Sequence, residues 1–104
     1  MGSPVPALIV NKVGISTTSN SKSYTAAGEG YVIVCEASWS NSAVSFSVTK
    51  NGSPVSPSST DGASDRNKYI YCWSVPVKNG DTILATMQCS AAADLYINMY
   101  AVIL

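Results

Sequence analysis

The segment Tyr69-Ile70-Tyr71-Cys72-Trp73-Ser74-Val75-Pro76-Val77 decides the fold class, because its large side chains fall on every second residue. In an extended strand this spacing places five side chains on one face, whereas a helix would scatter them. The five are Tyr69, Tyr71, Trp73, Val75 and Val77. The following Lys78-Asn79-Gly80-Asp81 contains Asn-Gly, a strong signal for chain reversal between apolar segments. Alternation then resumes in the next eight residues, with one side formed by Ile83, Ala85, Met87 and Cys89. The pattern predicts a hairpin, that is, two strands joined by one turn.

Further strands are predicted on both sides of this pair. Upstream, they cover residues 7–15 as one strand broken at 11–12, a short piece at 24–26, and the segments 31–39 and 44–49. Downstream, residues 95–104 form the last strand after a small-residue connection at 90–94. The polar runs 16–23 and 57–68 are predicted loops, and Asn51-Gly52 is a second reversal.

Seven to eight strands separated by Gly, Pro and Asn turns are typical of an antiparallel β-sandwich or jelly roll. We therefore predict an all-β fold of that class. Residues 1–6 carry two prolines and are predicted to form an extended N-terminal arm. Residues 7–104 are predicted to form a single domain, because a chain of 104 residues has no room for a second core.

The charge balance limits the partners that the chain can have. Six Lys plus Arg residues balance six Asp plus Glu residues, and charged residues make up only 12% of the sequence. A nucleic-acid partner is not expected, because phosphate binding needs a clustered positive surface. Membrane insertion is not expected, since no apolar run approaches about 20 residues. A signal peptide is not expected either, because the N-terminus lacks a charged region followed by an apolar one. A surface with so little charge has little self-repulsion, which favours association.

Enzymatic chemistry is not expected. The chain has no histidine, which excludes Ser-His-Asp and Cys-His sites, and no C-x-x-C pair offers zinc ligands. We predict no catalytic residue, metal or cofactor. The cysteines Cys35, Cys72 and Cys89 lie in predicted strands and are expected to be small buried hydrophobes; a disulfide between two of them stays open, because sequence cannot choose the pair.

Two features of the sequence suggest where a ligand would bind. Trp39 stands at a strand end beside Ser40-Asn41-Ser42 and is the aromatic expected to be most accessible, whereas Trp73 is expected in the core. If each strand runs from end to end, the 40–42 turn, the 57–68 loop and residues 91–94 share one end of the fold. The predicted ligand-binding residues there are Trp39, Asn41, Asp61, Asp65, Arg66 and Asn67. A calcium site at Asp61 and Asp65 is the less favoured interpretation, because the EF-hand spacing is missing.

The terminal strand predicts a homo-oligomer. One of its faces is apolar, through Leu95, Ile97, Met99, Ala101 and Ile103. The opposite face also carries large side chains, and a small chain cannot cover both sides of every strand. The predicted interface residues on that second face are Tyr96, Asn98, Tyr100 and Val102.

The segment Val75-Pro76-Val77-Lys78-Asn79-Gly80-Asp81-Thr82-Ile83 resembles the "V-P-V-K-x-G-D-x-I" segment of small β-sandwich domains in bacteriophage tail fibre and receptor-binding proteins. More distantly, it is similar to the Gly-Asp turn of C1q- and TNF-like trimeric jelly rolls. The upstream "G-Y-V-I-V" strand and "V-x-x-N-G" reversal of such domains have counterparts at residues 30–34 and 48–52.

The resemblance covers about residues 28–104. It implies a structural or receptor-binding domain of a virion appendage, commonly trimeric and sometimes bound to a cell-surface glycan or protein. It carries over no catalytic residue. The alternative function is that of a carbohydrate-binding, lectin-like module.

Overall fold

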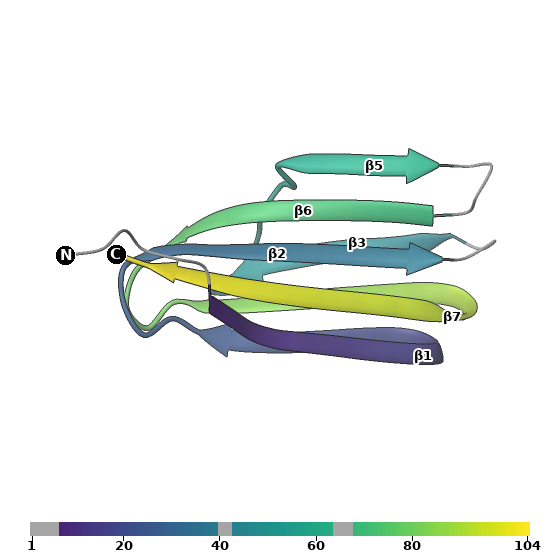
Figure 1. Cartoon of the computed structure of the whole chain (residues 1–104), viewed down its shortest axis with the longest axis horizontal. Helices are drawn as coiled ribbons and strands as arrows, with labels where there is room; N and C mark the ends of the chain where they lie inside the picture. Colours follow the sequence, from purple (N-terminus) through teal and green to yellow (C-terminus); the bar gives the residue numbers. More distant parts are fainter. Residues whose placement is uncertain (1–6, 40–42, 64–67) are drawn as a thin grey trace.

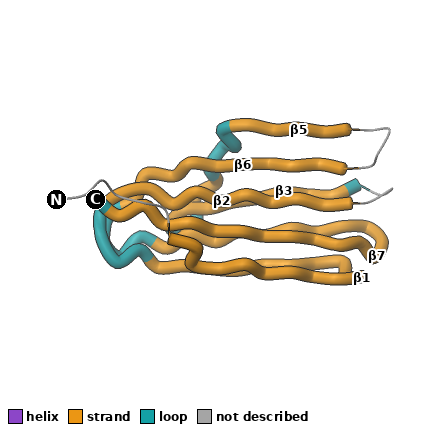
Figure 2. The backbone as a smooth tube through the Cα atoms, viewed as in Figure 1, coloured by secondary structure: helices purple, strands orange, loops and turns teal. Residues whose placement is uncertain are grey.

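The computed structural model describes residues 7–39, 43–63 and 68–104, with the side chains of 61–63 and 68 left aside. All the regular secondary structure in this part of the chain is β-strand (Figure 2). Both the all-β prediction and the expected number of strands are confirmed. The predicted arm at residues 1–6 lies outside the described residues. The strands are β1 (Ala7–Thr25), β2 (Gly30–Trp39), β3 (Val44–Lys50), β4 (Ser53–Pro54), β5 (Ser59–Ala63), β6 (Lys68–Val77) and β7 (Thr82–Ile103).

The strands form one antiparallel sheet that curls on itself (Figure 1). Its order is β4-β3-β7-β2-β6-β5, and β1 pairs with β7 from the other side. The first half of β7 pairs with β3 through residues 83–89, and its second half pairs with β2 through residues 94–103. β7 bends between its two halves, and β1, which pairs with both halves, bends at the same place. The bend brings β3 over the concave side of β2 and β6.

The bend is held by polar contacts between β1 and β7. At the turning point Ser16 has a φ of 48°, and its backbone N–H donates to Oδ1 of Asp94 over 3.1 Å. Asn20 is buried, and its Nδ2 donates to the carbonyl oxygens of Lys12 and Leu95, each over 3.0 Å. These bonds tie the two halves of β1 to each other and to the second half of β7.

Three predicted connections are wrong, because strand pairing extends through them. Residues 16–23 belong to β1, which is continuous past the predicted break at 11–12. Within the described part of the chain β1 is an edge strand that pairs with β7, so its Ser and Thr hydroxyls remain in water while the backbone bonds to β7. Residues 59–63 of the predicted 57–68 loop form β5, and residues 90–94 belong to β7, whose small side chains there permit the bend.

The predicted hairpin of β6 and β7 is also wrong. β6 pairs with β2 and β5, whereas β7 pairs with β1, β2 and β3. In the connecting turn φ is positive at Gly80 but not at Asn79, and Asp81 N donates to Lys78 O over 3.0 Å. This is the φ pattern of a type II turn, whose twist splays the flanking strands instead of pairing them.

The second Asn-Gly reversal is confirmed. Asn51 and Gly52 both have positive φ, 51° and 84°, as a type I′ turn requires. The strands on either side pair directly, through Lys50 and Ser53. The two Asn-Gly turns therefore differ in the conformation of the asparagine, and only the one at Asn51 makes a tight hairpin.

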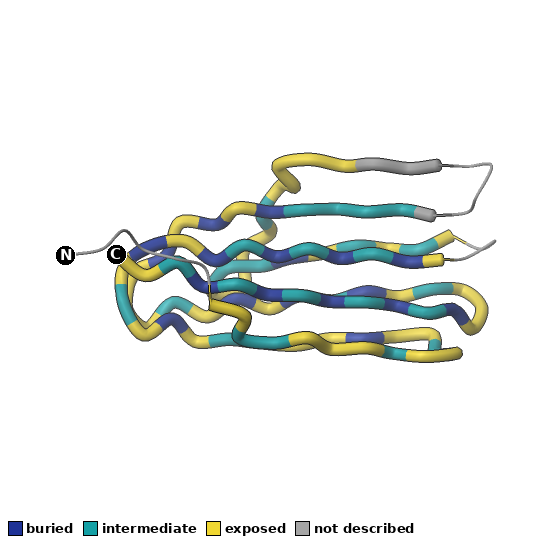
Figure 3. The backbone as a smooth tube through the Cα atoms, viewed as in Figure 1, coloured by how far each residue is buried: buried dark blue, intermediate teal, exposed yellow. Residues whose placement is uncertain are grey.

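The core lies on the concave side of the curled sheet, and burial alternates along the strands (Figure 3). The predicted faces of β6 and of both halves of β7 are confirmed, although Tyr69, Tyr71 and Cys89 are only partly buried and Ile103 is exposed. Phe46 from β3 stacks on Tyr71 from β6 with ring centroids 4.2 Å apart, which joins the two sides of the curl. Trp73 is 2% exposed, as predicted for the core, and its Nε1 donates to the carbonyl oxygen of Val55 over 3.0 Å.

Candidate functional site

The two ends of the curled sheet offer different groups to a ligand. At the end where β2 stops, called here the Trp39 end, Trp39 is the register partner of both Lys68 and Asp94. At the end where β2 starts, called the Gly30 end, the sheet carries the Asn51-Gly52 turn and the turn before β7 (Figure 1). The backbone thus brings the last residue of β2, the last residue of β5, the first residue of β6 and the bend of β7 to the same end.

The predicted ligand-binding residues are only partly described. The side chain of Trp39 is 48% exposed at the Trp39 end. Asp61 lies in β5 opposite Ile70, one of the positions whose backbone alone is described. The predicted residues that lie outside the described part of the chain are Asn41, Asp65, Arg66 and Asn67. A ligand site formed by these residues stays a prediction.

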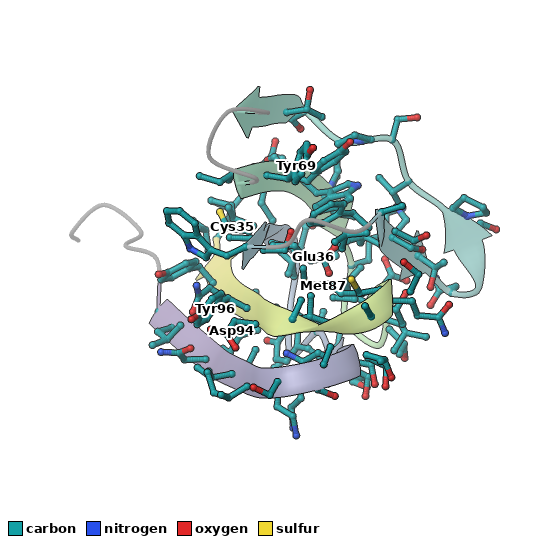
Figure 4. The ribbon with its side chains drawn as sticks, turned by 90° about the vertical axis from the view of Figure 1, so that its right-hand side faces the viewer. Cys35, Glu36, Tyr69, Met87, Asp94 and Tyr96 are labelled. Atoms are coloured by element: carbon teal, nitrogen blue, oxygen red, sulfur yellow. The ribbon has the colours of Figure 1, made fainter. Side chains whose placement is uncertain are left out.

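A buried polar pair lies inside the same end of the fold. Glu36 and Ser38 are both 0% exposed and continue the inward-facing row that begins with Val32 and Val34. Glu36 has Tyr71 and Ile97 as register partners on the neighbouring strands. Among the described residues, neither carboxyl oxygen of Glu36 nor Oγ of Ser38 has a hydrogen-bond partner. Figure 4 shows Glu36 and Met87 on the concave side of the sheet, with Cys35 and Tyr96 on the convex side.

Burial determines the protonation state of Glu36. Loss of solvation raises the pKa of this carboxyl from 4.5 to about 8, and the backbone N–H of Ser47 opposes the rise more weakly, since its contact with the carboxyl falls short of a full hydrogen bond. The carboxyl group is therefore mainly protonated at neutral pH. Since an unpaired ionised carboxylate in an apolar interior is far costlier than a neutral acid, the fold keeps the proton.

The alternation along β2 is a sequence signal for Glu36 and Ser38, which are not among the predicted site residues. Alternation beginning at Val32 and Val34 places Glu36 and Ser38 on the same inward face. A glutamate on a core face is unusual, because glutamate is almost never fully buried without a partner. Comparison of the two faces of this strand in the sequence is therefore sufficient to identify Glu36 as an unusual core residue.

The chemistry open to the buried pair is hydrogen bonding. A protonated carboxyl both donates and accepts, and a hydroxyl does the same. Hydrolytic chemistry would need a nucleophile beside a base or a pair of carboxylates, and Glu36 has no second carboxylate in hydrogen-bond contact. Among the described residues, no cluster of three or more His, Cys, Asp or Glu is placed to hold a metal ion.

A cavity of about 400 Å³ opens at the Gly30 end, at the opposite end of β2 from Trp39. Its charged groups already hold the turns around it: Lys50 Nζ donates to the carbonyl oxygen of Pro76 over 3.1 Å, and the Asp81 carboxylate accepts from Asn51 Nδ2 over 3.0 Å. The bonds from Asn51 and from the backbone N–H of Lys78 lower the pKa of Asp81. Tyr31 lines the cavity, and its side chain is 44% exposed to solvent.

The middle of the convex side of β2, β6 and β7 carries no charged residue, and charged positions border it at the Trp39 end, where Lys68 and Asp94 pair with Trp39. Neighbouring positions on it pair across the strands, for example Ile33 with Tyr100 and Ala37 with Tyr96. Exposed apolar side chains also reach this side at its edges, at Leu8, Val13, Tyr31 and Trp39. We call it the outer face and define it by Ile33, Cys35, Ala37, Ile70, Cys72, Ser74, Pro76, Tyr96, Asn98, Tyr100 and Val102.

All four predicted interface residues lie on the outer face, and each is partly exposed. No helix among the described residues has the length and apolar character needed to cross a membrane. Comparison with protein-family models, with curated proteins and with solved structures finds no match to this chain.

Proposed function

We propose that this chain is a non-enzymatic structural or receptor-binding domain of a virion appendage, such as a phage tail fibre, and that it assembles as a homo-oligomer. The number of subunits in the proposal is three, taken from the resemblance to tail-fibre domains. The proposal also treats the curled sheet as a member of the β-sandwich or jelly-roll class. Its location is the outside of the virion.

The observation that carries this proposal is the outer face. Its eleven defining residues span three neighbouring strands, include aromatic and aliphatic side chains and are uncharged, with the charged positions Lys68 and Asp94 at its border. Soluble monomers rarely expose a wide apolar patch, and obligate interfaces are rich in apolar area with aromatic anchors. The low overall charge of the chain supports the same conclusion, because little repulsion opposes association.

The test places a charge on the outer face and, in a matched control, on a different surface. Tyr100→Asp puts an unpaired carboxylate in the middle of the proposed contact, where its desolvation is costly. Ser45→Asp puts the same charge on an exposed position of β3. Sedimentation velocity should show dissociation of the Tyr100→Asp variant alone. Equal behaviour of the two variants would refute an interface on the outer face.

A carbohydrate-binding, lectin-like module is the second candidate. It is favoured by the exposed rings of Trp39 and Tyr31 at opposite ends of the sheet, because aromatic rings supply stacking platforms for sugars. A glycan array discriminates the two functions. Specific glycan binding by a monomeric protein favours the lectin-like module, whereas an oligomer without glycan hits favours the structural role.

A receptor site within the first proposal is expected at the Trp39 end. The triple replacement of Asp61, Asp65 and Arg66 by Ala should leave the urea unfolding midpoint unchanged and weaken binding to an identified receptor. Unchanged binding by this variant would exclude the Trp39 end as the site while leaving the assembly proposal intact.

A further inference from the structure

Two of the three cysteines face each other across neighbouring strands. Cys35 in β2 and Cys72 in β6 are direct register partners, and their Sγ atoms are 3.2 Å apart. Both side chains point to the outer face and are partly buried. Cys89 lies on the inward-facing row of β7, opposite Val44. All three cysteines are thiols in this structure.

We propose that Cys35 and Cys72 are a redox-active pair that forms a reversible cross-strand disulfide, and that Cys89 takes no part in it. Residues directly opposite in an antiparallel pair have Cα atoms about 4.5 to 5.5 Å apart, which falls within the range of about 4.4 to 6.8 Å that disulfides span. The sulfur atoms need to approach by only about 1.2 Å to reach the bonded distance of about 2.0 Å. The strands themselves can stay in register.

The oxidant in this proposal is a low-molecular-weight disulfide such as oxidised glutathione. The Cys72 thiolate attacks one sulfur of the oxidant, which forms a mixed disulfide and releases one thiolate. Cys35 then loses its proton and attacks Sγ of Cys72, which forms the protein disulfide and expels the second thiolate. The two cysteines are oxidised, the small disulfide is reduced to two thiols, and the two protons from the protein end on those thiols.

The environment of Cys35 supports this order of attack. Burial, together with the hydrogen bond and charge interaction with Cys72, raises the pKa of Cys35 to about 12. Cys35 is therefore a protonated thiol at neutral pH and a poor first nucleophile, because the thiolate is the reactive form. Its position 3.2 Å from Cys72 suits it instead to resolve a mixed disulfide on that residue.

The bond would lock the middle of the sheet under oxidising conditions. Cys35 and Cys72 are 37 positions apart in sequence, so the disulfide closes a long loop that contains β3, β4 and β5. Closing a long loop restricts the unfolded chain and stabilises the folded one. The proposal does not depend on the proposed function, because the two strands pair within one chain.

The test is oxidation of the folded protein in glutathione buffer, followed by alkylation of remaining thiols and peptide mapping by mass spectrometry. The expected product has a Cys35–Cys72 link and an alkylated Cys89, and its thermal midpoint rises by several degrees. Dithiothreitol should return both the mass and the midpoint to their starting values. Cys89→Ser should behave like the wild type, whereas Cys35→Ser should stop at a mixed disulfide on Cys72.

The same oxidation is run on the Tyr100→Asp variant, so that slow access within an oligomer is distinguished from absence of reaction. A linked product in either protein supports the proposal. Alkylation of all three cysteines in both proteins, or a link that includes Cys89, would overturn it.

Discussion

Replacing Glu36 with Gln should remove most of the pH dependence of stability between pH 4.5 and 8. In the folded protein burial raises the pKa of Glu36 to about 8, whereas the ordinary value is 4.5. The folded state therefore holds a proton that the unfolded state releases throughout this range. Stability is highest below pH 4.5 and falls as the pH rises through 8, because unfolding becomes coupled to release of that proton.

The size of the effect follows from the two pKa values. For each pH unit between 4.5 and about 8, the free energy of unfolding falls by about 1.4 kcal/mol. The loss across the whole range is about 5 kcal/mol. This figure is an upper limit, because relaxation of the fold around the ionised carboxylate reduces the cost of its charge. Even half of this loss is a large fraction of the free energy of unfolding of a small domain, which is ~5 to 15 kcal/mol.

Urea unfolding of both proteins at intervals from pH 4 to 9 measures this effect. The free energy of unfolding of the wild type should fall steadily with pH, while that of Glu36→Gln should stay nearly level. The chain has no histidine, so few other groups change protonation near neutral pH. Glu29→Gln is the matched control, since Glu29 is exposed at the Gly30 end, and it should follow the wild type.

The absolute stability of Glu36→Gln is not the diagnostic quantity, because the new amide would also be buried without a partner. The slope with pH is diagnostic. Parallel curves for Glu36→Gln and the wild type would refute the assignment of a buried, protonated Glu36.

Two further substitutions test the packing of the sheet. Gly30→Ala should lower the free energy of unfolding by about 1 to 3 kcal/mol, because its Cβ would collide with the backbone carbonyl of Val102 on β7; an unchanged urea midpoint would contradict that close approach. Asn20→Ala should cost about 1 to 3 kcal/mol, because the carbonyl oxygens of Lys12 and Leu95 lose their shared donor at the bend. Hydrogen exchange should then be faster at the bend than at the Gly30 end, and uniform exchange would show that Asn20 does not hold the bend.

The sequence predicted faces of strands better than it predicted their partners. Alternation in β6 and β7 assigned the inward-facing residues of these two strands, because the period of two depends only on local geometry. Strand partners depend on contacts far apart in the chain. The pairing of β6 with β2, not with β7, could not be read from residues 69–89 alone.

Polar composition misled the prediction of loops. The Ser- and Thr-rich residues 16–23 form an edge strand, where hydroxyl side chains remain in water without loss of backbone pairing. The candidate site was foreseen only in part. The Trp39 end and the outward tyrosines of β7 followed from strand direction and alternation, whereas Glu36 was passed over and the Cys35–Cys72 contact required knowledge of the strand order.

The most direct test of the central claim is the mass of the unmodified chain in solution, measured by light scattering at micromolar concentration and after serial dilution. A homotrimer held by the outer face predicts a mass near three times 10.9 kDa that persists on dilution. A stable mass of 10.9 kDa would contradict assembly through the outer face and leave the lectin-like module as the better account.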